Sequence, residues 1–281
     1  MDNWIDEDIW RCRNCSHWSS SFPATAANSQ IDALDEKQRR AALHGIRQSN
    51  AVTILKEITS HLKIENPMLC DVGTAYGWFL SLAQKAGFES IGIEPDRNVA
   101  EMAIQQGLPV RIGEFPQCLS NSEQFDVLTF NDVFEHLPEP SKILDACRFH
   151  MRPGGLLVID LPSSQGGLFW IARQLRRIGM RGTWDRLWQR SFPCPHCHYY
   201  SPSGLKVLLQ KAGFQVESTR ELPSFHYRGL WNRVRMQSDV GNMRAILLYF
   251  ALLSVSPVLR LLRSDIILQV YRVGPQPVAG R

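Results

Sequence analysis

Apolar residues near the start of the chain recur every three to four positions, the spacing that places them on one face of an α-helix. This spacing predicts a helix over residues 31–63. Its apolar positions are Ile31, Leu34, Leu43, Ile46, Val52, Leu55 and Ile58. Residues 1–30 lack this period and are rich in Trp, Ser and Asn, so we expect them to form an appendage.

The pattern then changes to short apolar runs that alternate with glycine turns and helical stretches. Seven strands are predicted, at residues 68–72, 91–93, 110–112, 125–130, 156–160, 214–217 and 266–271. Four helices are predicted among them, at residues 78–86, 99–106, 137–150 and 203–211. Strands that alternate with helices of this length indicate an α/β fold, in which helices cover both faces of a parallel sheet.

Two segments break the alternation. Residues 163–200 form an insertion rich in Arg and Trp after the fifth strand, and residues 243–262 predict an apolar helix. The sequence therefore predicts an appendage at residues 1–45 that includes the start of the first helix, an α/β domain at residues 46–273, and a flexible tail at residues 274–281.

The composition is that of an ordinary globular protein, with 44% hydrophobic and 21% charged residues. The net charge of +4 is too small to imply nucleic acid, and no RNA-binding module is recognisable. Seven scattered cysteines do not resemble the disulfide framework of a secreted protein. No run of about 18 apolar residues predicts a membrane-spanning helix. We expect a cytoplasmic protein, located at the inner membrane surface if the apolar helix contacts lipid.

The strongest local signal is the glycine turn that follows the first predicted strand, with Asp71, Gly73 and Gly77. A tight turn at this place exposes backbone N–H groups at the carboxyl end of a strand, where open α/β sheets bind ligands. Glu94 ends the next predicted strand, and a carboxylate there can accept hydrogen bonds from both hydroxyls of a ribose. A plain turn without a ligand is the alternative.

A dinucleotide site would need glycine at three positions of the same turn. Counted from Gly73, Ala75 and Trp78 stand at the second and third positions, and a Trp would prevent the close packing of helix on strand. Asp71 is badly placed to face a pyrophosphate and well placed to hold the ammonium group of a methionine-like ligand. The charges therefore favour S-adenosylmethionine over NAD.

Five segments, in order along the chain, carry a resemblance to a known family. They are residues 71–77, 91–96, 125–140, 151–160 and 198–214. With these motifs at these intervals, residues 50–217 resemble the class I S-adenosylmethionine-dependent methyltransferases, particularly the subgroup that acts on small molecules. The resemblance implies a Rossmann-like, seven-stranded, mainly parallel sheet whose last strand is antiparallel.

The same resemblance places residues at the cofactor by matching position. The turn residues Asp71, Gly73, Thr74, Ala75, Tyr76 and Gly77 would surround the methionine part. Glu94, followed by Pro95, would bind the ribose, and Glu114 and Phe115 would lie near the adenine. Asn131 and Asp132 would lie beside the cofactor. Ala75 stands where the family commonly has glycine, and its methyl group should leave binding intact.

A hydroxyl acceptor needs a base, and histidine titrates near neutral pH. His136 follows the fourth strand at the ligand-binding edge and is the best candidate for a catalytic base. Asp132, Asp160 and His198 are alternatives, and a purely structural role for His136 is also open.

The insertion should overhang the active-site edge as a substrate lid. It holds six arginines and three tryptophans: Arg173, Arg176, Arg177, Arg181, Arg186, Arg190, Trp170, Trp184 and Trp188. The arginines suit an anionic substrate, with a solvated helix as the alternative. Residues 245–253 are apolar on every side, which predicts burial in the core, a homodimer interface or, together with the insertion, peripheral membrane contact.

Two CxxC pairs stand far apart in the sequence, Cys12 with Cys15 and Cys194 with Cys197. Two such pairs form a tetrahedral zinc site if they meet in space. One interpretation is therefore a structural zinc that ties the appendage to the insertion. Unliganded thiols, or an incomplete zinc ribbon, are the alternatives.

Together these features predict methyl transfer from S-adenosylmethionine to a small-molecule or lipid-linked acceptor, anionic or sugar-containing. A catalytically inactive scaffold of the same fold and a nucleotide-dependent oxidoreductase or epimerase are the two competing hypotheses.

Overall fold

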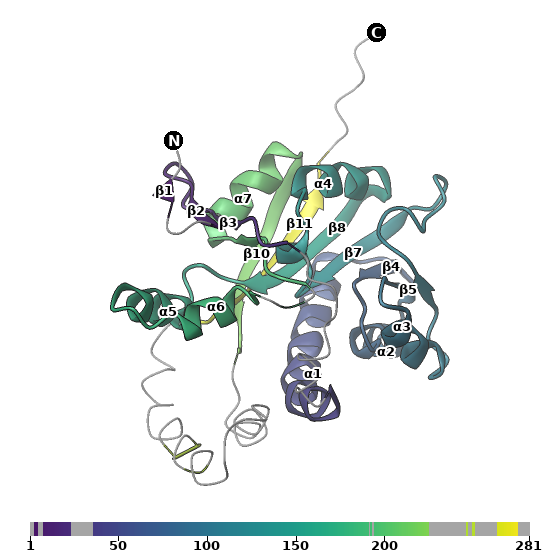
Figure 1. The fold of residues 1–281 in the computed structure, drawn as a ribbon. Helices are drawn as coiled ribbons and strands as arrows, with labels where there is room; N and C mark the ends of the chain where they lie inside the picture. The colour runs from purple at the N-terminus through teal and green to yellow at the C-terminus, as the bar shows by residue number, and fades with distance from the viewer. Residues whose placement is uncertain are drawn as a thin grey trace.

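Seven strands form the central sheet of the computed structural model, which describes residues 3–4, 8–23, 36–190, 192, 194–224, 246, 249–250 and 263–274 (Figure 1). Their order across the sheet is β10-β11-β8-β7-β4-β5-β6. The strands are β4 (Met68–Val72), β5 (Glu89–Glu94), β6 (Val110–Ile112), β7 (Phe125–Asn131), β8 (Met151–Pro162), β10 (Phe214–Leu222) and β11 (Ile266–Val273). Only β11 runs antiparallel to its neighbours among these strands. The predicted Rossmann-like, mainly parallel sheet is confirmed.

Helices cover both faces of this sheet. The helices of the domain are α1 (Glu36–His61), α2 (Trp78–Lys85), α3 (Arg97–Ile104), α4 (Pro140–Phe149) and α7 (Pro202–Lys211). Leu69 of β4 packs with Ile58 of α1 in one apolar cluster, whereas the next residue, Cys70, packs with Leu144 of α4 and Leu205 of α7 in another. Because neighbouring side chains enter opposite cores, the strands are apolar runs rather than alternating ones.

Two predicted boundaries were wrong. The fifth strand was expected to begin at residue 156, but β8 begins at Met151, and an irregular register against β7 between Phe125 and Val127 absorbs the extra residues. A helix was expected from residue 137, but a short 3-10 turn, η2 (Phe134–His136), comes first and α4 begins at Pro140. Proline is favoured in the first turn of a helix, where no N–H is needed.

The chain order creates a crevice between β4 and β7. From β4 the chain proceeds outward to β5 and β6, and then returns to the other side of β4 to form β7 and β8. The connections on the two sides diverge, and the space between them lies at the carboxyl ends of β4 and β7.

The N-terminal segment folds against the insertion. Its strands β1 (Asn3–Trp4), β2 (Ile9–Arg11) and β3 (Trp18–Ser20) join β9 (His198–Tyr199) of the insertion in a second, four-stranded sheet. Trp18 is paired with Tyr199 in antiparallel register. The appendage is therefore joined to the insertion by backbone hydrogen bonds.

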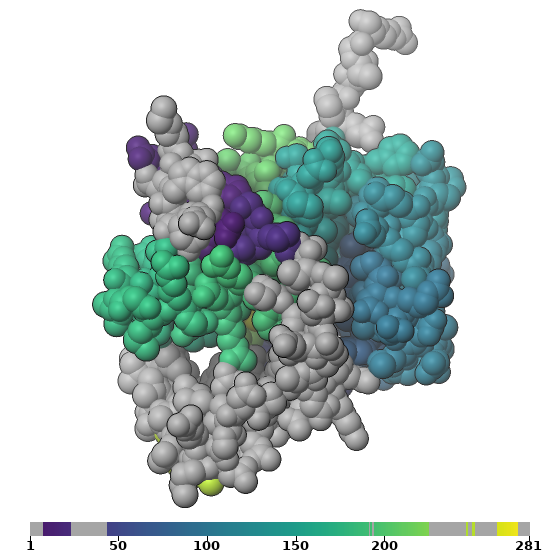
Figure 2. Space-filling view, viewed as in Figure 1, coloured from purple at the N-terminus to yellow at the C-terminus, as the bar shows by residue number. Residues whose placement is uncertain are grey.

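Helices α5 (Gly167–Arg177) and α6 (Gly182–Leu187) of the insertion complete this unit, and Figure 2 shows the purple hairpin directly against them. We call residues 8–20, 167–190 and 194–200 the cap. Its core consists of Ile9, Trp18, Phe169, Ala172, Trp184, Trp188 and Tyr199. Each large apolar side chain buried there stabilises the cap by roughly 1.5–3 kcal/mol, so these distant segments form one folded unit.

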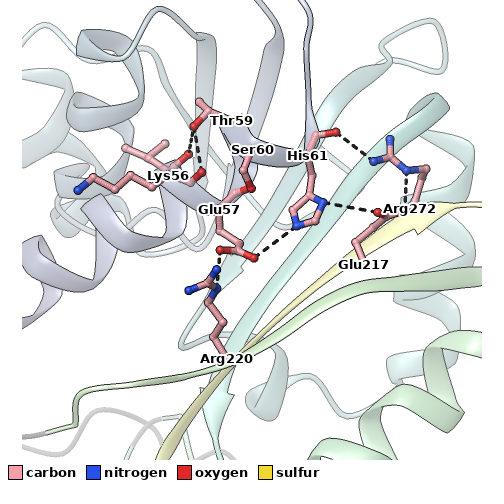
Figure 3. Close-up of polar contacts among 9 residues, drawn as sticks. Lys56, Glu57, Thr59, Ser60, His61, Glu217, Arg220 and Arg272 are labelled. Atoms are coloured by element: carbon pink, nitrogen blue, oxygen red, sulfur yellow. Dashed lines mark hydrogen bonds and ion pairs between the residues drawn. The ribbon is translucent and has the colours of Figure 1, made fainter.

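A polar network fastens the end of α1 to β10 and β11 (Figure 3). The His61 ring lies between Glu57 (3.4 Å) and Glu217 (3.5 Å), and Arg272 donates to Glu217 (2.7 Å) and to the His61 carbonyl (3.0 Å). Burial would raise the pKa of Glu57, but hydrogen bonds from Ser218 and Arg220 outweigh it and lower that pKa. The network fixes the direction of α1 across the sheet.

The predicted apolar helix at residues 243–262 and the predicted tail lie mostly outside the described residues. Within that helix the structure describes residues 246, 249 and 250, where Ile246 and Phe250 are exposed. Within the described part of the chain, no helix is both long and apolar enough to cross a membrane.

Candidate active site

The glycine turn between β4 and α2 is shaped by close contacts. Gly73 has a left-handed φ of 71°, and a Cβ atom there would lie 2.4 Å from a methyl group of Val133. The N–H groups of Gly73 and Thr74 donate to the carbonyl of Ile93, at 2.8 and 3.0 Å. The expectation that these N–H groups are exposed was therefore wrong for both. Since a pyrophosphate would need such donors, this finding weighs further against a dinucleotide.

Asp71 is a buried carboxylate at the end of β4. One of its oxygens accepts hydrogen bonds from Thr129 (2.7 Å) and Asn131 (2.8 Å), both on β7. Burial raises the pKa of Asp71 to about 6, although these hydrogen bonds oppose the shift. The carboxylate therefore ties β4 to β7 at the crevice and would be stabilised further by a cation.

Glu94 is held rigidly at the end of β5. Its two oxygens accept backbone hydrogen bonds from Ala75 and Asp96, each at 2.9 Å. Burial raises the pKa of Glu94, against the effect of these two bonds. A carboxylate oxygen accepts more than one hydrogen bond, so each can still accept one from a ligand.

A cavity opens between this turn and α1. It is lined by Arg47, Asn50, Ala51, Ile54, Asp71, Gly73, Thr74, Ala75, Tyr76, Trp78, Phe79, Asn131, Asp132 and Asp160. Seven predicted cofactor residues are thus brought together there: Asp71, Gly73, Thr74, Ala75, Tyr76, Asn131 and Asp132. The α1 residues were not predicted, although Arg47, Asn50, Ala51 and Ile54 have the spacing of one helical face.

Three acidic side chains line the cavity: Asp71, Asp132 and Asp160. Arg47 donates to Asp132 at 3.2 Å, and the Asp132 N–H donates to the carbonyl of Asp160. Asp132 has a left-handed φ of 52°, an uncommon conformation that concentrates at functional sites. Burial, and then the charge of Asp132, raises the pKa values of Asp160 and Glu135 well above their ordinary range. One oxygen of each has no hydrogen-bond partner in the described structure.

His136 contacts the cap rather than the cavity. Its Nδ1 lies 3.0 Å from the carbonyl of Pro195, and its Nε2 lies 3.9 Å from Glu135. The Pro195 carbonyl can only accept a hydrogen bond, so Nδ1 carries the proton and Nε2 the lone pair. Asp132 and Asp160, two of the alternative bases, line the cavity. The third, His198, contacts His17 in the cap.

The predicted adenine residues do not line the cavity. Phe115 packs edge-on against Phe130 in the core, with ring centroids 5.8 Å apart, and Glu114 is exposed. Pro95 is also exposed, and Gly77 is buried at the start of α2. The roles of Glu114, Phe115 and Pro95 stay predictions.

No three of the four cysteines of the CxxC pairs have sulfur atoms within 4.8 Å of one another in the described structure. Cys197 is hydrogen-bonded through its backbone to Ser20, whereas Cys12 is hydrogen-bonded through its backbone to His17. Ser20 and His17 are three residues apart along the hairpin, which corresponds to roughly 10 Å. All seven cysteines are described, and none forms a disulfide. This arrangement does not support the predicted four-cysteine zinc site, or Cys15 and Cys194 as members of it.

Among the described residues, one group of three side chains could hold a metal ion: Glu135, His136 and His196. Their possible ligand atoms lie within 4.8 Å of one another. Both ring nitrogens of His196 already have hydrogen-bond partners, Tyr199 and Gln189. The group is therefore explained by hydrogen bonding within the cap.

The insertion touches the active-site edge through its last segment. The N–H of Cys197 donates to the carbonyl of Glu135 at 2.9 Å. None of the six insertion arginines lines the cavity described here. Arg176 lies over Trp184, and Arg190 pairs with Asp8 at 3.0 Å. The positive charge that faces the cavity comes instead from Arg47.

Comparison with known proteins places this geometry in a family. Residues 40–219, more than half of the chain, match the sequence profile of a family described as a methyltransferase domain. Two similar curated proteins are named ubiquinone biosynthesis O-methyltransferase. The protein from Nitrosococcus oceani is 24% identical over 198 residues, which cover 66% of this chain and 78% of the relative. The protein from Paraburkholderia phymatum is 30% identical over 196 residues, with coverages of 66% and 79%.

Solved structures share the fold. Phosphoethanolamine N-methyltransferase 2 of Haemonchus contortus, in complex with phosphomonomethylethanolamine and S-adenosylhomocysteine, superposes with a TM-score of 0.58 at 15% identity. The match covers 91% of this chain and 62% of that one. An S-adenosylmethionine-dependent methyltransferase of Mesorhizobium loti gives a TM-score of 0.52 at 15% identity, with coverages of 77% and 96%.

Substitution of Gly73 by alanine should destabilise the fold more than the same change at Gly107. Both glycines have left-handed φ values, of 71° and 80°, but a Cβ at Gly107 would meet nothing within 4 Å. We expect Gly107→Ala to cost about 1 kcal/mol for the backbone conformation alone, and Gly73→Ala to cost roughly 2 kcal/mol more because Val133 must move. Urea unfolding of both variants measures the difference. Equal losses would mean that Val133 does not constrain the turn.

Proposed function

Because the chain belongs to the methyltransferase-domain family and is a class I S-adenosylmethionine-dependent methyltransferase, we propose that it methylates a hydroxyl oxygen of a small-molecule or lipid-linked acceptor. The names of the two curated relatives favour oxygen as the acceptor atom. The observation that carries the proposal is a pair of buried carboxylates at the glycine turn: Asp71, which lines the cavity, and Glu94, which accepts a hydrogen bond from the Ala75 N–H of the turn.

The residues at the turn fit this cofactor. Asn131 Oδ1 is buried and has no hydrogen-bond partner in the described structure, so it can accept a hydrogen bond from a ligand. Gly73 is needed at this turn because a side chain there would meet Val133. A positively charged ligand would also relieve the cost of burying Asp71 beside Asp160. In our proposal Asp71 and Asn131 hold the ammonium group and Glu94 holds the ribose hydroxyls.

S-adenosylmethionine supplies an electrophilic methyl group on a positively charged sulfur. The work of the protein is then to place the acceptor oxygen in line with that methyl and to exclude water. Ala51, Ile54 and Phe79 provide an apolar wall for the acceptor, and Arg47 provides a positive charge. This wall suits an aromatic or lipid-linked acceptor.

We assign the proton-accepting role to His136. Its Nδ1 donates to the Pro195 carbonyl, so the neutral ring carries its lone pair on Nε2. The cap thus fixes the tautomer that a base needs. Acceptor binding must bring the hydroxyl within reach of Nε2, because His136 does not line the cavity of the described structure.

Glu94→Gln should raise the Kd for S-adenosylhomocysteine at least about tenfold, because charge-assisted hydrogen bonds to the ribose would be lost. Calorimetric titration measures the affinity. Glu89→Gln is the matched control, because Glu89 stands at the opposite, exposed end of β5. Unchanged affinity in well-folded Glu94→Gln protein would remove the ribose assignment, and no binding by the wild type would remove the cofactor site.

Binding of S-adenosylhomocysteine should strengthen as the pH rises through about 6. The pKa of Asp71 is raised to about 6, so at pH 5 only about a tenth of the carboxyl groups are ionised and able to pair with the ligand's ammonium group. We expect a Kd about tenfold higher at pH 5 than at pH 7.5. Asp71→Asn should bind weakly with little pH dependence. The same slope in both proteins would assign the titration to another group.

His136→Gln should slow methyl transfer by about 10²–10⁴-fold, the usual contribution of a base, while the Kd for S-adenosylhomocysteine stays within about twofold of wild type. Transfer of a radiolabelled methyl group to a panel of phenols, catechols and sugars measures the rate. His198→Gln is the control. A larger loss in that variant would move the role of the base to His198, and full activity of His136→Gln would leave His136 a structural role.

A further inference from the structure

The turn between α5 and α6 exposes large apolar side chains at the edge of the cap. Ile178 is 73% exposed and Met180 57%, and Trp170 on α5 is 53% exposed. Of the twelve large apolar side chains exposed among the described residues, four fall between residues 168 and 180. An exposed apolar cluster of this kind marks a surface that contacts something else.

Arginines accompany these apolar groups. Arg177 lies seven residues after Trp170, which places both on the same side of α5. Arg181 follows Met180 directly, and both arginines are exposed. Neither forms an ion pair with an acidic residue in the described part of the chain. Asp185, the acidic residue of the insertion, pairs with Arg190 instead, at 3.7 Å.

We define Trp170, Arg177, Ile178, Met180 and Arg181 as the cap tip, and we propose that it docks on the surface of an anionic lipid bilayer. A segment that lies at a membrane interface combines three kinds of side chain. Aliphatic groups enter the acyl boundary, an indole lies at the level of the headgroups, and arginines face the lipid phosphates. The positive charge is complementary to anionic headgroups, whereas a purely apolar protein partner would leave the arginines unpaired.

The position of the tip supports this assignment. In Figure 1, α5 projects away from the seven-stranded sheet. The buried side of the same helix carries Phe169 and Ala172 into the cap core, so the tip rests on a packed support. The cap in turn contacts the turn of Glu135 and His136. Docking would therefore bring a bilayer to the element that borders the active site, as the lipid-linked form of the proposed acceptor requires.

Flotation of the purified full chain with vesicles tests the proposal. The vesicles contain phosphatidylcholine alone or phosphatidylcholine with phosphatidylglycerol. We expect the protein to float with the anionic vesicles, and less at high salt. The double variant Ile178→Asp, Met180→Asp should lower the partition coefficient roughly tenfold. Arg177→Gln with Arg181→Gln should weaken binding and reduce its dependence on salt.

Ile64→Asp with Val207→Asp is the matched control, because these apolar side chains are 51% and 45% exposed outside the cap. It should float like the wild type. Failure of the wild type to float with anionic vesicles, or flotation of the tip variant at the wild-type level, would overturn the proposal. A wild-type dimer in sedimentation velocity that the tip variant dissociates would assign the tip to self-association instead.

The proposed function supplies only the biological reason for membrane docking, so the docking proposal and the proposed function can fail separately. Each variant is also titrated with S-adenosylhomocysteine, and the tip variants should bind it as the wild type does. Loss of cofactor binding in protein that still floats would contradict the proposed function and leave the docking surface in place.

Discussion

Buried carboxylates at the carboxyl ends of β4 and β8, the two strands that flank β7, are the constraint on which the rest of the site depends. Asp71 lies near the end of β4, just before the glycine turn, and Asp160 lies near the end of β8. Each side chain is less than 5% exposed. Removing an ionised carboxylate from water costs several kcal/mol unless partners replace the water. Asp71 receives two side-chain hydrogen bonds from β7, whereas Asp160 keeps one oxygen without a partner. The fold therefore retains a local destabilisation that a cationic ligand would relieve.

Two remote parts of the chain are arranged around this acidic crevice. The network of Glu57, His61, Glu217 and Arg272 fixes the last turns of α1 against β10 and β11 (Figure 3). The same helix carries Arg47 to Asp132. On the other side, the cap brings the Pro195 carbonyl to His136. The positive charge of Arg47 and the tautomer of His136 are thus set by α1 and the cap, which lie outside the strands that form the site.

The sheet and its glycine turn could be predicted from the sequence because their signals are local. Strands buried on both faces are continuous apolar runs, and Gly73 and Gly77 have the left-handed φ values that favour glycine in a tight turn. The cap could not be predicted, because β3 and β9 are two or three residues long and pair across most of the chain. Arg47 was missed for a similar reason. Its helical face was visible in the spacing, but only the tertiary fold shows that this face covers the crevice.

A crystal structure of the protein with S-adenosylhomocysteine tests the central claim most directly. The account predicts both ribose hydroxyls within about 3 Å of the Glu94 oxygens and the ammonium group within hydrogen-bond distance of Asp71 or Asn131. A ligand bound elsewhere, or bound at the turn with its ammonium group away from these residues, would contradict the view that the buried carboxylates exist to hold this cofactor.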